Sequence, residues 1–546
     1  MQTENRKEKT MKIRLPDRLS VYTEDACLGF DAAERVEMGD ILVSLDIFRD
    51  ALSVFVSADK TPLKYIKLRW NLSEDERRRG SLKVLGDSWE RAYGDLEWHS
   101  VNPERCLPFY FLVSNGSDQE RDRLGRFTEG FGVKVQAGAM CFWNYDGSGI
   151  TLWMDVRCGG DGVILGGRTL HASDIVFGEY RNMSAYEAAE HFCHVMSPVT
   201  LTPPHKVYGF NNWYYAYGKS SHEQIMRDTR LAASLCRGLA NPPYMVIDDG
   251  WQPNACDGPW DRGNERFPDM AALAREIKAE GVRPGIWVRY LADRGLTQKD
   301  TIPSEWRSMR DERFIDPSHP DALAHIAGIT KRFVDWGYEL IKQDFTTMDL
   351  FGKRSADKIT EDGWHFYDRS RTSAEITVEL YRTIKKAAGD AVVIGCNAVT
   401  HLCAGLCELN RTGDDTSGRY WSRTRNRGVN AVAFHGPQNG AFYTCDADCV
   451  GILPGRIPWE LNRKWLELVS KSGTPLFVSC DPDAATDEVC RDLRRAFEIN
   501  SVQENRLVPL DWMENVCPRR WLFDGEEKDI NWFDADGRED FGPVKY

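Results

Sequence analysis

Charged side chains stand at the ends of several short apolar runs in the middle of the sequence. The residues are Asp248 and Asp249 in VIDDGW, Lys342 and Asp344 in LIKQDF, and Arg411, Asp414 and Asp415 in LNRTGDD. One aspartate at such a place usually caps a helix or forms a surface ion pair, but three acidic run ends are harder to explain in that way. Two carboxyl groups flanking one bond are what glycoside cleavage needs, because one stays ionised beside the developing oxocarbenium ion and the other protonates the leaving oxygen. The pattern therefore predicts a glycosidic site, in which Lys342 and Arg411 keep their neighbours ionised and anchor sugar hydroxyls.

These residues need a scaffold that gathers separate strand ends, and the sequence after residue 200 alternates short apolar strands with helical patterns. The predicted strands are 206–210, 244–248, 283–288, 338–342, 391–396, 407–411, 441–445 and 475–480. Apolar residues at helical spacing fill 222–236, 320–336 and 374–389, and Ser318 with Asp321 is interpreted as a capping box for the second of these helices. Eight such units indicate a (β/α)8 barrel, whose chemistry lies in the loops at the carboxyl ends of its strands.

The regions on either side of the predicted barrel have a different pattern of apolar residues. Up to about residue 199, short alternating runs such as DILVSLDIF, ALSVFVSA and GITLWMDVRC are separated by Gly, Asp and Asn turns, which is typical of an antiparallel β-sandwich. The segment MSPVTLTPPHK is typical of a linker. The predicted organisation is a β-sandwich domain at 1–199, the (β/α)8 TIM barrel at 200–500, and a small antiparallel β region at 501–546.

Aromatic residues follow the first two predicted barrel strands. The chain has 18 tryptophans, and FNNWYYAYG and DDGWQPNACDGPW place Trp213, Tyr214, Trp251 and Trp260 near the predicted site. Rings with a polar edge stack on the CH faces of sugars, whereas most of the other tryptophans are expected in the core. We therefore predict that these rings, Trp213 and Trp251 above all, take part in substrate binding.

Composition restricts the partners of the protein. Its 70 Lys and Arg against 83 Asp and Glu give a formal charge of −13, and no basic run is long enough to follow a phosphate backbone, so nucleic acid is not expected. Neither a signal peptide nor an apolar stretch of membrane-spanning length is apparent, so we expect a cytoplasmic protein without a membrane partner. No set of His, Asp and Cys has the spacing of metal ligands, and neither a metal nor another cofactor is expected. The 15 cysteines are interpreted as reduced thiols, and the oligomeric state is left open, a homo-oligomer included.

Several motifs in the right order carry a resemblance to a known family. They are YGFNNWYY, VIDDGWQ, LIKQDF, GCNAVTHLCAGLCELNRTGDDTSGRYW and TCDADCVGIL, between about residues 206 and 482. Together they resemble the retaining α-galactosidases of glycoside hydrolase families 27 and 36, the melibiase group. The resemblance implies that Asp344 is the nucleophile and that Asp415, four residues after Arg411, is the acid/base. It also implies that Asp248 and Asp249 bind the hydroxyls at C4 and C6 of the sugar.

The resemblance implies cleavage of terminal α-galactosides in an oligosaccharide or glycoside by double displacement. We expect the loop around Cys396 and Asn397 to face the C2 substituent. We also expect the nucleophile to raise the pKa of Asp415, with Arg411 reducing the shift. Alternatives on the same fold are an α-N-acetylgalactosaminidase, a β-L-arabinopyranosidase and a transglycosylase of the raffinose-synthase kind. A non-catalytic sugar-binding protein is disfavoured, because it would be expected to lose Asp344 or Asp415.

Overall fold

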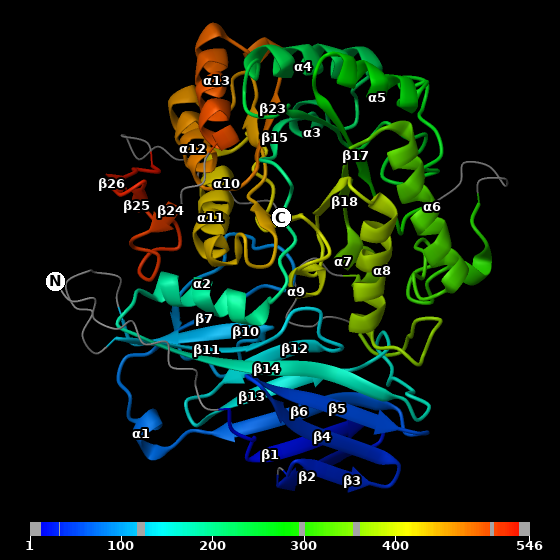
Figure 1. The fold of residues 1–546 in the computed structure, drawn as a ribbon, viewed down its shortest axis with the longest axis vertical. Helices are drawn as coiled ribbons and strands as arrows, with labels where there is room; N and C mark the ends of the chain where they lie inside the picture. The colour runs from blue at the N-terminus through cyan, green and yellow to red at the C-terminus, as the bar shows by residue number, and fades with distance from the viewer. Residues whose placement is uncertain are drawn as a thin grey trace.

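A computed structural model of the protein describes residues 13–31, 33–116, 126–293, 301–352, 361–502 and 507–533. Antiparallel sheets from the first part of the chain form one end of the molecule, and a ring of parallel strands surrounded by helices forms the other (Figure 1). A three-stranded sheet near the end of the chain lies against the side of the ring. The predicted fold class, a β-sandwich, a (β/α)8 barrel and a short β region, is confirmed.

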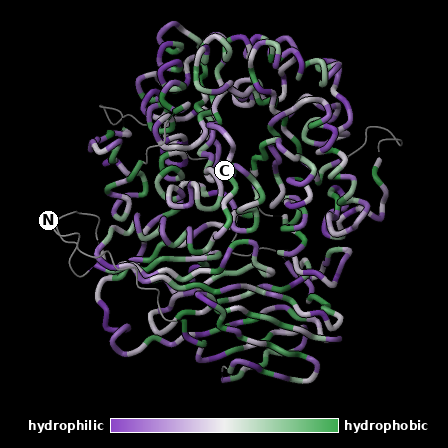
Figure 2. Tube along the Cα trace, viewed as in Figure 1, coloured by the Kyte–Doolittle hydropathy of each residue, from purple (hydrophilic) through white to green (hydrophobic). Residues whose placement is uncertain are grey.

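Two antiparallel sheets pack together in the N-terminal part. One has the order β2 (Cys27–Asp31), β1 (Arg18–Thr23), β6 (Leu63–Asn71), β13 (Gly149–Asp155), β12 (Met140–Tyr145) and β9 (Leu107–Pro108). The other has the order β3 (Arg35–Met38), β4 (Ile41–Phe48), β5 (Ala51–Ala58), β14 (Thr169–Arg181), β11 (Phe127–Val133), β10 (Tyr110–Ser114), β7 (Lys83–Gly86) and β8 (His99–Ser100). Alternate residues of β4, namely Ile41, Val43 and Leu45, are buried, as the period of two predicts for a strand with one core face. Figure 2 shows hydrophobic and hydrophilic positions interleaved along these strands.

A helix that the sequence analysis did not anticipate covers the eight-stranded sheet. Helix α2 (Ala185–Met196) begins at a capping box formed by Ser184 and Glu187. Its Phe192 packs so closely on β11 that a Cβ at Gly130 would come within 2.7 Å of the ring. The helix lies between the sandwich and the barrel (Figure 1), so it joins the two cores.

Parallel strands form the barrel in chain order. They are β15 (Tyr208–Asn211), β16 (Tyr244–Ile247), β17 (Arg283–Val288), β18 (Leu340–Gln343), β19 (Val392–Gly395), β20 (Leu409–Arg411), β21 (Thr444–Asp446), β22 (Val450–Ile452) and β23 (Leu476–Cys480). They are short and almost wholly buried, because helices cover their outer face and side chains fill the interior. Each predicted barrel strand is confirmed in position to within three residues at either end.

The seventh barrel segment is broken in two, which the sequence analysis did not predict. β21 pairs with β20 and β22 pairs with β23, so the chain between them closes the ring. Asp448 lies in this break with a φ of +79°, and its N–H donates to Asp446 Oδ1 at 2.9 Å. Asp446 still pairs with Arg411 as the last residue of β21, whereas Asp448 lies outside the ladder, at the carboxyl-end face of the barrel.

Helices surround the ring, and the three that the sequence predicts are confirmed as α4 (His222–Leu235), α6 (Pro320–Trp336) and α8 (Ser373–Ala388). The proposed capping box of α6 is wrong: His319 is the N-cap and accepts from the Asp321 N–H, while the Ser318 hydroxyl donates to Asp316 at 2.7 Å. The other α-helices of the barrel region, within the described residues, are α3 (Trp213–Ala216), α5 (Met270–Ala279), α7 (Thr346–Phe351), α9 (Thr400–Cys403), α10 (Trp421–Thr424), α11 (Asn430–Phe434), α12 (Trp459–Lys471) and α13 (Asp487–Val502). The short α1 (Glu74–Arg77) lies in the sandwich (Figure 1).

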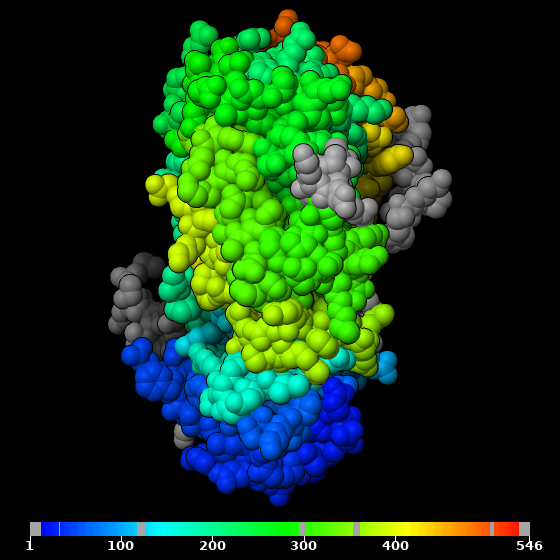
Figure 3. Space-filling view, turned by 90° about the vertical axis from the view of Figure 1, so that its right-hand side faces the viewer, coloured from blue at the N-terminus to red at the C-terminus, as the bar shows by residue number. Residues whose placement is uncertain are grey.

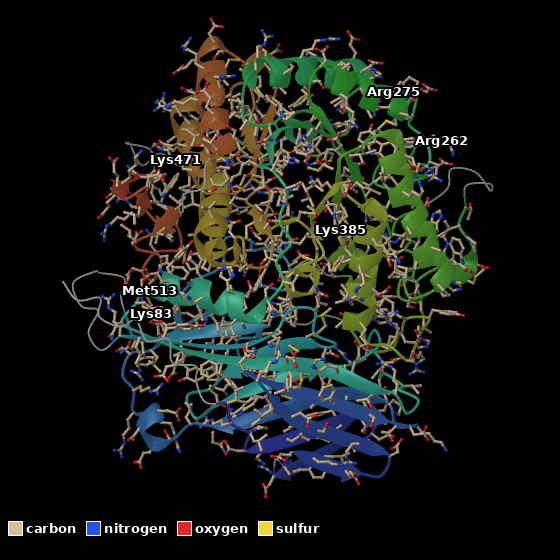
Figure 4. All side chains as sticks on the ribbon, in the orientation of Figure 1. Lys83, Arg262, Arg275, Lys385, Lys471 and Met513 are labelled. Carbon is tan, nitrogen blue, oxygen red and sulfur yellow. The ribbon has the colours of Figure 1, made fainter. Side chains whose placement is uncertain are left out.

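The β-rich parts are held to the barrel by backbone and side-chain hydrogen bonds. Gln136 donates to Ala404 O at 2.8 Å, and the Ser373 N–H donates to Arg157 O at 2.8 Å. The C-terminal sheet consists of β24 (Leu507–Pro509), β25 (Arg520–Phe523) and β26 (Glu526–Asp529). Lys83 of β7 donates to Met513 O, in the loop between β24 and β25, and the two residues lie side by side in Figure 4. In Figure 3 the surfaces of sandwich and barrel meet without a gap on the face in view. Residues 534–546 of the predicted C-terminal region lie outside the described residues.

Candidate active site

Lys342 connects two of the strand ends singled out in the sequence. It lies at the end of β18, and its Nζ donates to Asp248 Oδ2, after β16, at 2.8 Å. Asn211 of β15 donates to the same oxygen at 2.7 Å. Burial alone would lower the pKa of Lys342, but the charge of Asp248, with smaller contributions from Cys396 and Asp344, outweighs it and raises the pKa. The ammonium group therefore stays charged in the centre of the carboxyl-end face.

Asp344 is oriented by two donors. Its Oδ1 accepts the N–H of Phe345 at 2.7 Å, and its Oδ2 accepts the indole N–H of Trp287, from β17, at 3.0 Å. The side chain is only partly buried. A carboxylate that is fixed by two hydrogen bonds and still partly exposed has the properties that a nucleophile needs.

Neighbouring aspartates after β20 have opposite environments. The Asp414 side chain is 3% exposed and forms ion pairs with Arg91 at 3.0 Å, with Arg423 at 3.4 Å, and with Arg427. The Asp415 side chain is 34% exposed. Asp414 is therefore committed to protein partners, whereas Asp415 is accessible to a ligand.

Two arginines meet the same oxygen of Asp415. Arg411 Nη2 lies 3.2 Å and Arg91 Nη1 lies 3.3 Å from Oδ1. Burial would raise the pKa of Asp415, but the charges of Arg91 and Arg411 outweigh burial and hold this pKa well below its ordinary value. The expectation of a raised pKa is therefore wrong, because it included only one of the two cations in contact with Oδ1.

The side chain of Arg411 is buried and paired with another residue of the protein. Its side chain is 3% exposed, and its Nη1 lies 2.9 Å from Asp448 Oδ1, in the break of the seventh barrel segment. The other oxygen of Asp448 accepts from the hydroxyl of Tyr214. Arg411 thus positions Asp415, and Tyr214 is an anchor for this network instead of a sugar-stacking ring.

Asp249 is enclosed by the loop that follows it. Its Oδ1 accepts from Gln252 Nε2 at 2.6 Å and from the Cys256 N–H at 3.0 Å, and the Cys256 thiol donates to Oδ2 at 2.9 Å. Burial and the nearby carboxylate raise the pKa of Cys256 to about 12, so the thiol keeps its proton. Cys256 was not predicted as a site residue.

The loop after β19 is buried against a residue of the β-sandwich. Cys396 is 1% and Asn397 is 3% exposed, and Asn397 Nδ2 lies 3.3 Å from Glu90 Oε1. Glu90 is fully buried, and burial raises its pKa to about 7, although the charge of Arg91 opposes the shift. Asn397 therefore faces the sandwich domain through its amide.

Glu90 and Arg91 belong to the loop between β7 and β8, residues 87–98, which sequence reasoning missed. The Ala92 N–H donates to Thr412 O at 2.9 Å, and the Asp414 N–H donates to Ala92 O at 3.0 Å. The charged pair in SWERAY looks like an ordinary loop, and 324 positions separate Arg91 from Asp415. No local pattern in one sequence signals a contact of that length.

The predicted aromatic contacts to sugar are only partly compatible with the structure. Trp251 is 0% exposed, packs on Trp260 and Phe333, and donates its indole N–H to Trp287 O at 2.9 Å. The predicted substrate-binding role of Trp251 is therefore wrong, because a ring with no accessible face is a core residue. Trp213 is partly exposed, and its ring lies 5.0 Å from that of Tyr217, which is 38% exposed. Trp213 stays a candidate for stacking on sugar.

Alanine substitutions separate these two tryptophans. Trp251→Ala is expected to lower the free energy of unfolding by about 3–5 kcal/mol, because it leaves a large cavity in the core. Trp213→Ala is expected to raise KM for a glycoside about tenfold, which corresponds to about 1.4 kcal/mol of binding, with little change in stability. Urea denaturation and steady-state kinetics measure the two effects. A Trp251→Ala protein of normal stability would contradict the assignment of this ring to the core.

Neither a metal site nor a spanning helix is found in the part of the chain that the structure describes. No three His, Cys, Asp or Glu residues there are grouped so that they could hold a metal ion. No described helix is both long enough and apolar enough to cross a membrane.

Comparison with solved structures identifies the architecture, although no family profile matches the sequence. The α-galactosidase of Thermus thermophilus in complex with p-nitrophenyl α-D-galactopyranoside superposes with a TM-score of 0.59 at 14% identity, covering 91% of this chain and 98% of that one. This is the fold of the α-galactosidases. A family 36 α-galactosidase from Geobacillus stearothermophilus, bound to 1-deoxygalactonojirimycin, gives 0.60 at 11% identity, over 96% of this chain and 80% of its own. The α-galactosidase of Lactobacillus brevis superposes with a TM-score of 0.59 at 12% sequence identity, covering 89% of this chain and 73% of that one.

Proposed function

We propose that the protein is a retaining, exo-acting glycoside hydrolase that cleaves terminal α-galactosides, with Asp344 as nucleophile and Asp415 as acid/base. One observation carries the proposal. On the fold of the α-galactosidases, the partly buried Lys342 lies among carboxylates from three strand ends. It donates to Asp248, the charge of Asp344 helps to raise its pKa, and its own charge helps to lower the pKa of Asp415. Carboxylates gathered on a barrel face are the groups that glycoside cleavage requires.

In this mechanism Asp344 attacks the anomeric carbon while Asp415 gives its proton to the leaving oxygen, so the glycosidic bond breaks as the Asp344 ester forms. Asp415 then takes a proton from water, which attacks the anomeric carbon and releases Asp344. Two displacements return the α configuration. The hydrogen bonds from Trp287 and Phe345 fix the carboxylate of Asp344 for the first step. The separation of the two carboxyl groups is expected to be about 5–5.5 Å, as in retaining enzymes.

The buried acceptors after β16 support selection for galactose. Asp248 and Asp249 are 3% and 5% exposed. Asp248 Oδ1 accepts from the Asp249 N–H and Asp249 Oδ2 accepts from the Cys256 thiol, so each oxygen has a second lone pair that stays desolvated unless a sugar hydroxyl meets it. An axial hydroxyl at C4 and a hydroxyl at C6 are the groups proposed to meet them. Complexes of related folds with stachyose and with raffinose support an oligosaccharide as substrate.

This proposal predicts the sugar preference. The kcat/KM for nitrophenyl α-galactoside is expected to exceed that for the α-glucoside by at least about 10²-fold, because an equatorial C4 hydroxyl does not reach the second lone pair of a buried carboxylate oxygen. The N-acetylgalactosaminide is also expected to be poor, since the amide of Asn397 is already engaged by the buried Glu90. A panel of nitrophenyl α- and β-glycosides measures both preferences. Equal rates on the gluco and galacto substrates would refute the role given to Asp248 and Asp249.

A further inference from the structure

The guanidinium group of Arg91 bridges two carboxylates that belong to another domain. Its Nη2 lies 3.0 Å from Asp414 Oδ1, and its Nη1 lies 3.3 Å from Asp415 Oδ1. The arginine side chain is 7% exposed. A planar fork that reaches two buried or half-buried acceptors restricts the rotamers of both, and a lysine cannot reproduce that geometry.

The backbone around Arg91 is held on both sides, so its position follows from the fold. Ala92 exchanges hydrogen bonds with Thr412 O and with the Asp414 N–H, and the Thr400 N–H donates to Trp89 O at 3.1 Å. The Arg91 guanidinium also lies 5.5 Å from the centre of the Tyr93 ring. The β7–β8 loop is therefore anchored to the segments that follow β19 and β20.

We infer that Arg91 is a positioning residue of the glycosidic site: the β-sandwich inserts it beside Asp415, where it fixes that carboxyl group and opposes its protonation. This inference rests on the proposed function, and it gives the sandwich domain a part in the chemistry of the barrel.

Other charges face Asp415 from every element around it. The cations are Arg411 at the end of β20, Arg423 of α10 and Lys342 of β18; the buried Tyr214 hydroxyl of α3 also lies near, and Asp414 and Asp448 are adjacent carboxylates. Arg91 and Arg411 are the two cations in hydrogen-bond range of Oδ1, whereas Arg423 reaches Asp414 instead. Arg91 is thus the one direct partner of Asp415 that another domain supplies, within the described residues.

The two steps of the reaction make opposite demands on Asp415. Protonation of a poor leaving group needs the neutral acid, whereas activation of water needs the carboxylate. A second cation beside Asp415 favours the carboxylate, so it supports the second step and limits the first. With poor leaving groups, kcat/KM of the natural protein should consequently fall as pH rises above a low apparent pKa of Asp415.

Replacement of Arg91 by glutamine tests this inference through pH profiles. With raffinose as the substrate, Arg91→Gln is expected to move the alkaline limb of kcat/KM upward by about 1–3 pH units, the usual effect of removing one adjacent opposite charge. The leaving group of a nitrophenyl α-galactoside needs no protonation, so the pH profile of kcat/KM for this substrate should be the same in Arg91→Gln as in the natural protein. Arg91→Lys should move the raffinose limb less than glutamine does, because it keeps a charge. Arg79→Gln, which removes an arginine paired to Glu129 at 2.7 Å in the same domain, should leave both profiles unchanged.

Equal losses of activity at every pH and on both substrates, with no shift of the limb, would overturn the inference in favour of a purely structural role. A readout without turnover covers the case in which Arg91→Gln does not fold. Infrared titration of the ¹³C-aspartate-labelled natural protein, with Asp415→Asn subtracted, should place the pKa of Asp415 below the ordinary value of about 3.9. A value at or above the ordinary one refutes the inference. If the protein cleaved no glycoside but the pKa of Asp415 were below the ordinary value, the proposed function would be refuted, whereas the placement of Arg91 beside Asp415 would stand.

Discussion

Asp344→Ala is expected to reduce turnover of an activated α-galactoside to the background rate while the protein stays folded. The residue supplies the bond-forming atom, and loss of a nucleophile removes a covalent route that alanine cannot replace. The carboxylate is partly exposed and accepts from Trp287 and from the following N–H. It forms no ion pair within 4 Å with any residue that the structure describes, so its removal breaks none. Steady-state kinetics and thermal unfolding of the variant measure the two expectations.

Azide distinguishes a missing nucleophile from a damaged site. In Asp344→Ala, azide can occupy the vacated space and attack the anomeric carbon once, so nitrophenyl α-galactoside should give the β-galactosyl azide by inversion. Asp344→Asn keeps the size of the side chain, fills that space, and should show no rescue. Normal turnover by either variant would remove Asp344 from the mechanism.

Asp415→Ala is expected to slow substrates with poor leaving groups by about 10²–10⁴-fold, the contribution of general acid catalysis. Nitrophenyl substrates, whose leaving group departs without protonation, should form the glycosyl-enzyme at nearly the natural rate. Azide should then attack the intermediate that water no longer reaches efficiently and give the α-galactosyl azide, opposite in configuration to the product of Asp344→Ala. Kinetics with raffinose and nitrophenyl galactoside, and NMR of the azide product, measure these effects.

Asp414→Asn is the matched control for Asp415. Asp414 is buried among Arg91, Arg423 and Arg427, so loss of its charge is expected to cost about 3–5 kcal/mol of stability. It should show neither the dependence on leaving group nor rescue by azide. Azide rescue in Asp414→Asn, with none in Asp415→Ala, would reverse the assignment of the acid/base.

The scaffold could be predicted because its signals are local. Short buried strands alternate with amphipathic helices, and the carboxyl ends of parallel strands meet at one face. The sequence therefore predicts that the strand ends with Lys342 and Asp248 converge, and the two side chains are in contact. For Asp414 and Asp415, after β20, the sequence shows that the two residues are adjacent but not which of their side chains is exposed. The structure separates the pair, since one side chain is 3% and the other 34% exposed.

Other features depend on contacts that a single sequence does not encode locally. Trp251 follows a strand end as a sugar-binding ring would, yet its side chain turns into the core, because tertiary packing decides which way a loop residue points. Asp448, in the break of the seventh barrel segment, is paired with Arg411 and accepts from Tyr214, and both partners are distant from it in the sequence. The sign of the pKa shift of Asp415 depends on Arg91, which arrives from another domain.

Covalent labelling of the nucleophile tests the central claim most directly. A 2-deoxy-2-fluoro-α-galactosyl fluoride should form an ester that hydrolyses slowly, because the electronegative substituent destabilises the oxocarbenium-like transition state of both steps. Peptide mapping by mass spectrometry should place the added fluorogalactosyl group on Asp344, within LIKQDF. A label on any other carboxylate, or inactivation without a label, would contradict the mechanism.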